Sequence, residues 1–270
     1  MVVILGAGYT GRFIYAQAIA RGLSALVTSR TPDTHLPFAS PSHRIPFDLN
    51  REATWGNLPA GADLIWCFPA MPLECVSAFA ETVRVLQHAR RIVVLGSTSA
   101  YETSAIDAHH EIDESAPIDT TRPRVMGEEY LRTHSQAIVL RVAGIYGPGR
   151  HVLDWIRRGK VGPSQRYVNL IHVEDLAGIC LSALEKGRAG EIYNVSDGRP
   201  RRWSEICDVA KARWGVVPVK NDSDQRPGKR LSIEKMTQDL GYRFQHPDLY
   251  RALGAIESSI SCRPPGAPIG

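Results

Sequence analysis

The chain opens on Val2-Val3-Ile4-Leu5-Gly6-Ala7-Gly8-Tyr9-Thr10-Gly11-Arg12, and this stretch decides the fold. Four apolar residues predict a buried strand, and the amphipathic segment Phe13–Arg21 predicts a helix directly after the glycines. The glycines have the G-x-G-x-x-G spacing, and strand, turn and helix in this order are the context in which the motif binds a dinucleotide. We therefore expect a dinucleotide site at the amino terminus.

Each glycine of this motif has its own physical task. Gly6 permits the tight turn, Gly8 lets the backbone approach a pyrophosphate, and Gly11 lets the helix pack closely on the strand. The free N–H groups at the start of the helix then face the phosphates. The motif thus predicts both the site and the part of the ligand that it holds.

Composition places the chain among ordinary globular proteins. Of its 270 residues, 43% are hydrophobic and 22% are charged. This length suits one nucleotide-binding domain with a smaller lobe. The net charge is only +4 and the basic residues are scattered, so a nucleic-acid partner is not expected. No apolar stretch reaches the roughly 18 residues of a membrane span, so a membrane partner is not expected either.

The cysteines and the amino terminus indicate the cellular compartment that we expect for the protein. The five cysteines are odd in number and form no C-x-x-C pair, which favours free thiols over a disulfide framework or a zinc site. The amino terminus lacks the basic flank and apolar core of a secretory signal. We expect a cytoplasmic protein that holds no metal.

Short apolar strands alternate with helical patterns in the first half of the chain. The predicted strands are Val2–Leu5, Ala25–Thr28, Arg44–Phe47, Leu64–Phe68, Ile92–Leu95 and Ile138–Arg141. The intervening helices include Phe13–Arg21, Cys75–His88 and Val125–Thr133. Apolar strands separated by helices indicate a parallel sheet covered on both sides. The expected fold is α/β, a doubly wound Rossmann parallel sheet with a small carboxy-terminal α/β substrate lobe.

The pattern becomes less regular after Gly149. We expect a nucleotide-binding domain over residues 1–150, a substrate-binding lobe over 151–262 and a flexible tail over 263–270. In the second half, helices are predicted over Val152–Arg158, Glu174–Leu184, Trp203–Trp214 and Ile233–Leu240, and strands over Tyr167–Ile171 and Ile192–Val195. The last of these strands is a candidate to return to the main sheet.

Five motifs in sequence carry a family resemblance. After the opening fingerprint come Leu95-Gly96-Ser97-Thr98-Ser99-Ala100-Tyr101, Leu140-Arg141-Val142-Ala143-Gly144-Ile145-Tyr146-Gly147-Pro148-Gly149, Ile171-His172-Val173-Glu174-Asp175-Leu176-Ala177 and Ile192-Tyr193-Asn194-Val195-Ser196-Asp197. The chain resembles the extended short-chain dehydrogenase/reductase superfamily. It is most similar to the atypical branch described as NAD-dependent epimerase/dehydratase-like. The resemblance implies a small-molecule substrate, and it makes a homodimer one expected state.

The residues after the second strand bear on the choice of dinucleotide. NAD sites usually carry an acidic residue about 20 positions after the glycines, but this chain has Arg30 there, between Ser29 and Thr31. Arginine and hydroxyl groups attract a 2′-phosphate, so we expect NADP(H), with NAD(H) as the alternative. Asp48 matches a family position that contacts adenine, although it could equally cap a helix. The candidate cofactor-binding residues are Gly6, Gly8, Tyr9, Thr10, Gly11, Arg12, Ser29, Arg30, Thr31, Asp48 and Pro69.

The resemblance also implies a catalytic centre, and one part of it is missing. Ser97 or Thr98 matches the residue that holds the substrate oxygen, and Tyr101 matches the tyrosine that follows it, so these three are the catalytic candidates. The superfamily's Tyr-x-x-x-Lys pair, in which the lysine favours phenolate, does not occur. Thr120–Gly127, where it should fall, contains no tyrosine, and the first lysine of the chain is Lys160.

Three explanations for the missing pair stay open. In the first, another acid acts, with Tyr101, Glu128, His109 and His110 as candidates. Arg122 or Arg124 could stabilise an oxyanion, although arginine does not shuttle protons. Alternatively, the protein binds its dinucleotide and does no chemistry. We favour chemistry, because positioning alone contributes much of such catalysis.

Basic residues gather where family members bind substrate. They are Arg150, Arg157, Arg158, Lys160, Arg166, Arg226, Lys229 and Arg230. They indicate an anionic substrate, and a solvated basic face is the alternative. His172 and Asp175 are expected to be structural, and Arg199, Arg201 and Arg202 are expected at the surface.

The sequence therefore supports three functional hypotheses. The first is an NADP(H)-dependent oxidoreductase that reduces or oxidises a carbonyl or imine on a small, anionic metabolite. The second is a nucleotide-sugar epimerase or dehydratase. The third is a non-catalytic NADP(H)-binding sensor or scaffold.

Overall fold

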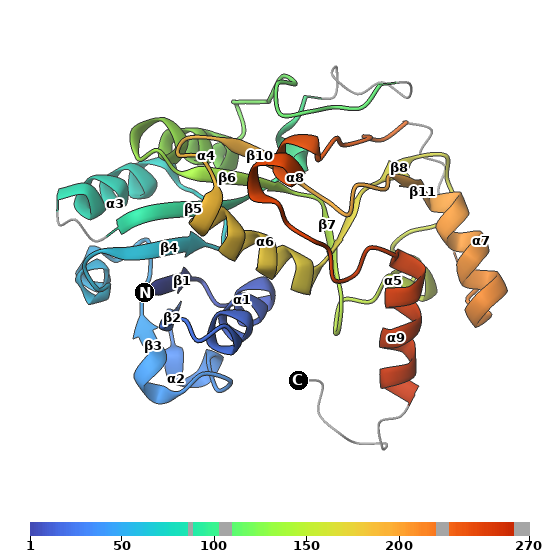
Figure 1. Cartoon of the computed structure of the whole chain (residues 1–270), viewed down its shortest axis with the longest axis horizontal. Helices are drawn as coiled ribbons and strands as arrows, with labels where there is room; N and C mark the ends of the chain where they lie inside the picture. The colour runs from blue at the N-terminus through green and yellow to red at the C-terminus, as the bar shows by residue number, and fades with distance from the viewer. Residues whose placement is uncertain (86–88, 103–109, 220–226, 262–270) are drawn as a thin grey trace.

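A seven-stranded parallel sheet forms the centre of the computed structural model, which describes residues 1–85, 89–102, 110–219 and 227–261 (Figure 1). Its strands lie in the order β10-β6-β5-β4-β1-β2-β3. Their bounds are β1 Val2–Leu5, β2 Ala25–Ser29, β3 Arg44–Pro46, β4 Ala62–Trp66, β5 Ala89–Ser97, β6 Ile138–Val142 and β10 Ile192–Val195. The predicted doubly wound parallel sheet is confirmed.

The strand order changes direction between β1 and β4. From β1 the chain runs outward to β2 and β3, and then crosses back to β4 on the other side of β1. The helices that follow β1 and β4 therefore leave the sheet on opposite faces, which opens a crevice at the carboxyl ends of the strands. This is where open α/β sheets bind their ligands.

Helices cover both faces of the sheet. Helices α1 (Tyr9–Ala20) and α6 (Val173–Lys186) lie on one face, and α3 (Leu73–Val85) and α4 (Pro123–His134) lie on the other (Figure 1). Helix α8 (Glu234–Leu240) packs beside α6. Successive side chains of a strand point to opposite faces. The β1 residues therefore alternate between two cores, and the run of four apolar residues is buried throughout.

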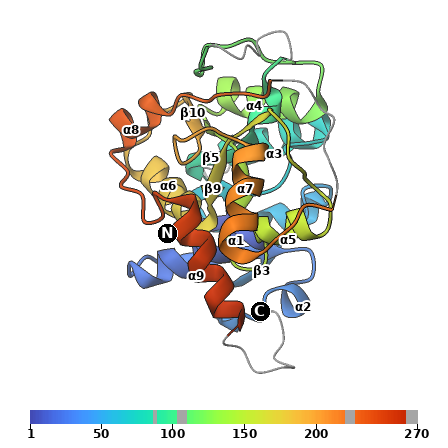
Figure 2. The same ribbon diagram turned by 90° about the vertical axis from the view of Figure 1, so that its right-hand side faces the viewer.

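The second lobe has a core of its own. Helices α5 (Val152–Arg157), α7 (Trp203–Trp214) and α9 (Leu249–Ser261) surround it (Figure 2). Four short strands form two further two-stranded sheets: β7 (Gly144–Tyr146) pairs with β9 (Leu170–His172), and β8 (Tyr167–Val168) pairs with β11 (Arg201–Arg202). Shorter elements are α2 (Pro32–His35), η1 (Pro41–His43), η2 (Glu52–Asn57) and η3 (Thr98–Ala100).

Two features of this lobe differ from the sequence analysis. Arg201 is buried rather than at the surface, because its guanidinium forms an ion pair with the buried Asp197 at 2.8 Å. The predicted strand over Tyr167–Ile171 is two strands, β8 and β9, which pair with different partners. Within the described residues, no helix is both long and apolar enough to span a membrane.

Candidate functional site

A cavity of about 660 Å³ lies at the carboxyl ends of β1, β2 and β3. It contains seven of the predicted cofactor-binding residues, namely Gly6, Gly8, Tyr9, Arg12, Ser29, Arg30 and Asp48. Gly11 lies behind it in the first turn of α1, and Thr31 is bonded to His35 at 2.9 Å and is not among the lining residues. The fold thus brings most of the predicted cofactor residues to one wall.

The glycine turn has the close contacts that the motif requires. Gly6 has a φ of +81°, and a Cβ added there would lie 2.6 Å from the Phe68 ring. A Cβ on Gly11 would lie 2.9 Å from the Gly6 carbonyl oxygen, so only glycine lets α1 pack this closely. Gly8 differs, because its Cβ would meet no atom within 4 Å and Gly8 itself lines the cavity. The space at Gly8 fits a group that approaches the backbone, as a pyrophosphate does.

Two arginines and one carboxylate are the charged residues among those that line this cavity in the described part of the chain. Arg12 and Arg30 both line it, and the Arg12 guanidinium lies 5.7 Å from the centre of the Phe38 ring. His35, which the sequence analysis did not identify, joins them and hydrogen bonds with the Ser29 hydroxyl at 3.2 Å. A lone histidine in a short polar segment gave no pattern by which to find it. The Asp48 carboxylate accepts the Asn50 N–H at 3.0 Å and so stabilises a turn rather than a helix start.

A small cavity of about 200 Å³ continues this site along the sheet edge. It shares Cys67 and Phe68 with the first cavity. It brings Thr10 and Pro69, the two remaining cofactor candidates, beside Ser97 at the end of β5. The predicted cofactor and catalytic residues therefore meet here.

A third cavity, of about 690 Å³, lies between β5 and the second lobe. It shares Ser97, Val142 and Ala143 with the small cavity, so the three cavities form a row. Ser97, Thr98 and Tyr101 line it from the sheet side. The second lobe and the loops beside it add mainly polar, aromatic and cationic side chains, including Arg122, Arg166, Tyr167, Asn169, Trp203 and Lys229.

The charged residues that line the third cavity in the described part of the chain are all cationic. Arg122, Arg166 and Lys229 line it, and none of its described lining residues is an aspartate or glutamate. Arg122 forms an ion pair with Asp119 at 2.8 Å and also donates to the Ser99 carbonyl. The cavity therefore suits an anionic ligand. Of the other predicted basic residues, Arg226 lies outside the described residues.

The three catalytic candidates have different surroundings. The Ser97 hydroxyl accepts the Ser99 N–H at 3.2 Å and the Ser99 hydroxyl at 3.0 Å, and Ser97 lines both the small cavity and the third cavity. Thr98 offers its carbonyl oxygen to Lys229 at 2.5 Å. Tyr101 is buried, and its hydroxyl donates to Asn194 at 2.6 Å. Burial raises the pKa of Tyr101 to about 12.

The other candidate acids lie away from the third cavity. Glu128 is buried on α4, where it pairs with Arg124 at 2.7 Å, and burial raises the pKa of its carboxyl group. Arg124 also donates to the Leu95 carbonyl and lines the small cavity. His110 is exposed, and His109 lies outside the described residues.

Lys229 reaches the site from a distant part of the sequence. Asn169 holds its backbone: the side-chain amide nitrogen donates to the Lys229 carbonyl at 2.8 Å, and the amide oxygen accepts the N–H of Leu231, two residues further on, at 3.1 Å. Gly228 has a φ of +72° and lies against the Tyr167 backbone, where a Cβ would be 2.3 Å from the carbonyl oxygen. Burial, with Arg122 and Arg166 nearby, lowers the pKa of Lys229 to about 8.

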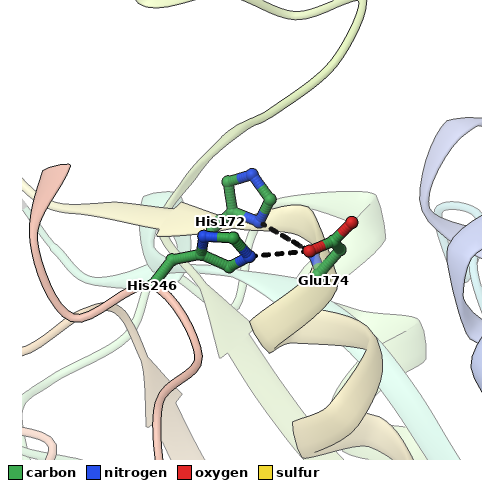
Figure 3. A group of neighbouring side chains, drawn as sticks. All are labelled: His172, Glu174 and His246. Atoms are coloured by element: carbon green, nitrogen blue, oxygen red, sulfur yellow. Dashed lines mark hydrogen bonds and ion pairs between the residues drawn. The ribbon is translucent and has the colours of Figure 1, made fainter. Parts of the chain in front are cut away.

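His172, Glu174 and His246 form a separate group at the start of α6 (Figure 3). One nitrogen atom from each imidazole ring and one carboxylate oxygen lie within 4.8 Å of one another. The His172 ring accepts the Glu174 N–H at 3.3 Å, and burial lowers its pKa to about 3, so the neutral ring caps the helix. The Glu174 carboxylate bonds to His246 at 2.6 Å. These bonds give the group a structural role, as expected for His172.

Asp175 joins the same region to the carboxy-terminal segment. Its buried carboxylate accepts bonds from the Tyr242 hydroxyl and from the N–H groups of Gln245 and His246. Asp175 therefore holds this segment against α6, rather than only stabilising the first turn of the helix.

Comparison with known families agrees with this geometry. Residues 2–196 match the model of the family described as "NAD dependent epimerase/dehydratase family". The chain belongs to this family. The match confirms the family that the resemblance implied.

Individual proteins are similar to this chain at sequence identities of 15% to 32%. Protein YeeZ of Escherichia coli K12 is 32% identical over 168 residues, which are 58% of this chain and 59% of that protein. The chain thus spans about 59% of the length of this curated relative. A short-chain dehydrogenase/reductase superfamily protein from Agrobacterium tumefaciens with bound NAD is 15% identical, with a TM-score of 0.79 over 97% of each chain. MoeE5 in complex with UDP-glucose and NAD is 18% identical, with a TM-score of 0.76 over 96% of this chain and 98% of that one. At these identities, the two solved structures share the fold.

Proposed function

We propose that this protein is an NADP(H)-dependent oxidoreductase that reduces a carbonyl group, or oxidises the corresponding alcohol, on a small anionic metabolite. The observation that carries the proposal is the row of three cavities joined at Ser97. A dinucleotide held on the glycine turn would extend along this row toward Ser97. The third cavity would then hold the substrate beside it.

The chain's own residues supply binding and orientation. The turn at Gly6 and Gly8 and the first N–H groups of α1 would hold the pyrophosphate. When bound, the nicotinamide supplies or accepts a hydride. The Ser97 hydroxyl would hold the substrate oxygen by a hydrogen bond that strengthens as negative charge develops on it. Arg122 and Arg166 would attract the anionic part of the substrate.

The preference for NADP(H) rests on charge. Arg12 and Arg30 line the first cavity, and Asp48 is the one carboxylate among its described lining residues. Guanidinium groups form strong charge-assisted bonds with phosphate. A 2′-phosphate would therefore gain affinity there. The solved relatives named above contain NAD, so this preference distinguishes the present chain from them.

Replacing Arg30 with aspartate tests this preference. We expect Arg30→Asp to weaken NADPH binding by at least about tenfold and NADH binding much less, because only NADPH carries the phosphate that the new carboxylate repels. Fluorescence titration with both dinucleotides measures the two effects. Arg251→Asp, an exposed change on α9 outside the three cavities, controls for net charge. Equal losses for NADPH and NADH would contradict the assignment.

Replacing Ser97 with alanine tests the chemistry. We expect Ser97→Ala to lower kcat for NADPH-dependent reduction of carbonyl compounds by about a hundredfold, because an oxyanion donor is lost. The affinity for NADPH should stay the same. Ser77→Ala, a change at a half-buried serine of α3 outside the three cavities, is the matched control. A panel of carbonyl compounds with carboxylate or phosphate groups supplies the substrates. Undiminished turnover would remove Ser97 from the mechanism, and wild-type binding without any turnover would instead favour a sensor or scaffold.

A nucleotide-sugar epimerase or dehydratase is the second candidate. The size and the three cations of the third cavity favour it, because a nucleoside diphosphate carries two phosphates to pair with them. MoeE5, which has this fold, is known in complex with UDP-glucose. Such a reaction recycles its cofactor, so purified protein carrying tightly bound NAD⁺ would favour this candidate. Exchange with free NADPH would favour the reductase.

A further inference from the structure

We propose that Lys229 is the acid–base residue of this site, and that its ammonium group supplies the proton to the substrate oxygen. The proposal rests on the proposed reductase function. It answers the question left by the missing Tyr-x-x-x-Lys pair, because a lysine from the second lobe reaches the catalytic centre from outside the nucleotide-binding half.

The position of Lys229 is the first argument. Its ammonium nitrogen lies 2.5 Å from the Thr98 carbonyl oxygen and 6.0 Å from the centre of the Tyr101 ring. Thr98 directly follows Ser97, and both line the same cavity as Lys229. A substrate oxygen held by Ser97 would therefore lie near a lysine that has two further N–H groups to donate.

The backbone of Lys229 is held in place, which a catalytic group needs. Asn169 bonds to the chain at Lys229 and at Leu231. On the other side, the Tyr167 N–H donates to the Pro227 carbonyl at 2.8 Å, and Gly228 packs on the Tyr167 backbone. A surface lysine would not need such support, whereas preorganisation is what positions an acid for catalysis.

The electrostatics of the cavity make the proton available. Burial and the neighbouring Arg122 and Arg166 lower the pKa of Lys229 to about 8. At neutral pH the amine is still mostly protonated, yet it releases its proton far more readily than a lysine with an ordinary pKa near 10.5. An ideal acid–base group has a pKa near the working pH, and Lys229 meets this condition.

The competing groups are less well suited. The Tyr101 hydroxyl donates its hydrogen bond to Asn194, and burial raises the pKa of Tyr101. Glu128 is paired with Arg124 and does not line the cavity. The other two cations of the cavity are Arg122 and Arg166, and a guanidinium group does not shuttle protons. Among the described lining residues, Lys229 is therefore the group best able to exchange a proton near neutral pH.

The proposed step balances. The carbonyl carbon gains a hydride from the reduced nicotinamide, and the electron pair of the carbonyl π bond takes a proton from the Lys229 ammonium. An N–H bond of Lys229 breaks and an O–H bond of the product alcohol forms. The dinucleotide is oxidised, the carbonyl is reduced, and the neutral Lys229 amine then regains a proton from water. The reverse reaction uses the amine as the base.

The first test needs no substrate. Protein labelled with ¹³C at the lysine ε carbon is titrated by NMR, and the Lys229 signal is assigned as the one missing from Lys229→Arg. We expect that signal to titrate near pH 8, well below the ordinary lysine pKa of about 10.4. A midpoint in the ordinary lysine range would overturn the proposal.

The second test separates an acid from a structural residue. Lys229→Arg keeps the positive charge and a donor for the Thr98 carbonyl but does not release a proton, whereas Lys229→Met loses all three. We expect both variants to lower kcat about a hundredfold. The wild-type kcat for reduction should fall above pH 8 as the ammonium is lost, and this fall should be absent in Lys229→Arg. Lys211→Arg, on the exposed face of α7, is the control.

The outcomes distinguish this proposal from the function on which it rests. If Lys229→Arg retains the wild-type kcat and pH dependence, Lys229 is a structural residue. The acid–base proposal is then overturned, while the proposed reductase function stands. If the wild type binds NADPH but reduces no carbonyl compound, the proposed reaction itself is overturned, and the acid role falls with it.

Discussion

Replacing Gly8 with alanine is expected to weaken NADPH binding by at least about tenfold, which corresponds to 1.4 kcal/mol. The reason is geometric: the added Cβ would enter the open space of the first cavity, where no protein atom lies within 4 Å. This is the space into which a pyrophosphate would fit against the backbone. Fluorescence titration with NADPH measures the loss.

The same substitution should leave the fold intact. Gly8 precedes α1 in an extended conformation that alanine also adopts, and the cost at this capping position should stay below about 1 kcal/mol. Gly56→Ala is the matched control, because its Cβ also meets no atom within 4 Å but the residue lies outside the three cavities. Normal NADPH affinity in Gly8→Ala would show that the glycine turn holds no ligand.

Gly127→Ala is expected to destabilise the protein by about 3 kcal/mol or more, because the added methyl group overpacks a close contact. Gly127 lies in α4, and its Cβ would be 1.9 Å from the Ala70 carbonyl oxygen and 2.8 Å from the carbonyl carbon. Both atoms belong to the backbone, so α4 or the segment after β4 must move. Urea unfolding followed by circular dichroism measures the change in the free energy of unfolding.

Gly254→Ala provides the contrast. Gly254 also lies within a helix, α9, but its Cβ would make an ordinary contact of 3.8 Å with the Trp214 ring. Helix propensity should then stabilise the protein by up to about 1 kcal/mol. If Gly127→Ala were as stable as Gly254→Ala, the close approach of α4 to Ala70 would be wrong. That approach matters for function because Pro69 and Arg124 beside it line the small cavity.

The sequence predicts the sheet well because its strands are buried on both faces. Val2–Leu5 is apolar throughout and lies between two cores, so strand and burial follow from the same four residues. Helix α1 begins at Tyr9 rather than Phe13, because Gly8 already serves as its capping residue. Strand β4 lies two residues earlier than the apolar run Leu64–Phe68, since its pairing with β1 begins at Asp63.

Helix α9 was not predicted, although its sequence has a recognisable helical pattern. In α9, Leu249, Ala252, Leu253 and Ile256 recur at helical spacing and are all buried. The burial of Arg201 had no comparable local signal, because it depends on how the turn brings Asp197 to face it. A charged cluster beside a proline is more often exposed than paired.

The acid–base residue could not be located from the sequence. Lys229 lies 131 positions after Thr98, and the two meet because Asn169 and the Tyr167 backbone fix the segment that carries the lysine. Sequence spacing can reveal a Tyr-x-x-x-Lys pair within one helix, but it does not reveal contacts made between lobes. The candidate cofactor residues are easier to predict, because the glycine turn is a local motif.

Calorimetric titration of the wild-type protein with NADPH, with NADH in parallel, tests the central claim most directly. NADPH should bind saturably, and NADH should bind more weakly. The absence of binding heat for both dinucleotides at several temperatures would contradict the assignment of the first cavity, and with it the proposed chemistry.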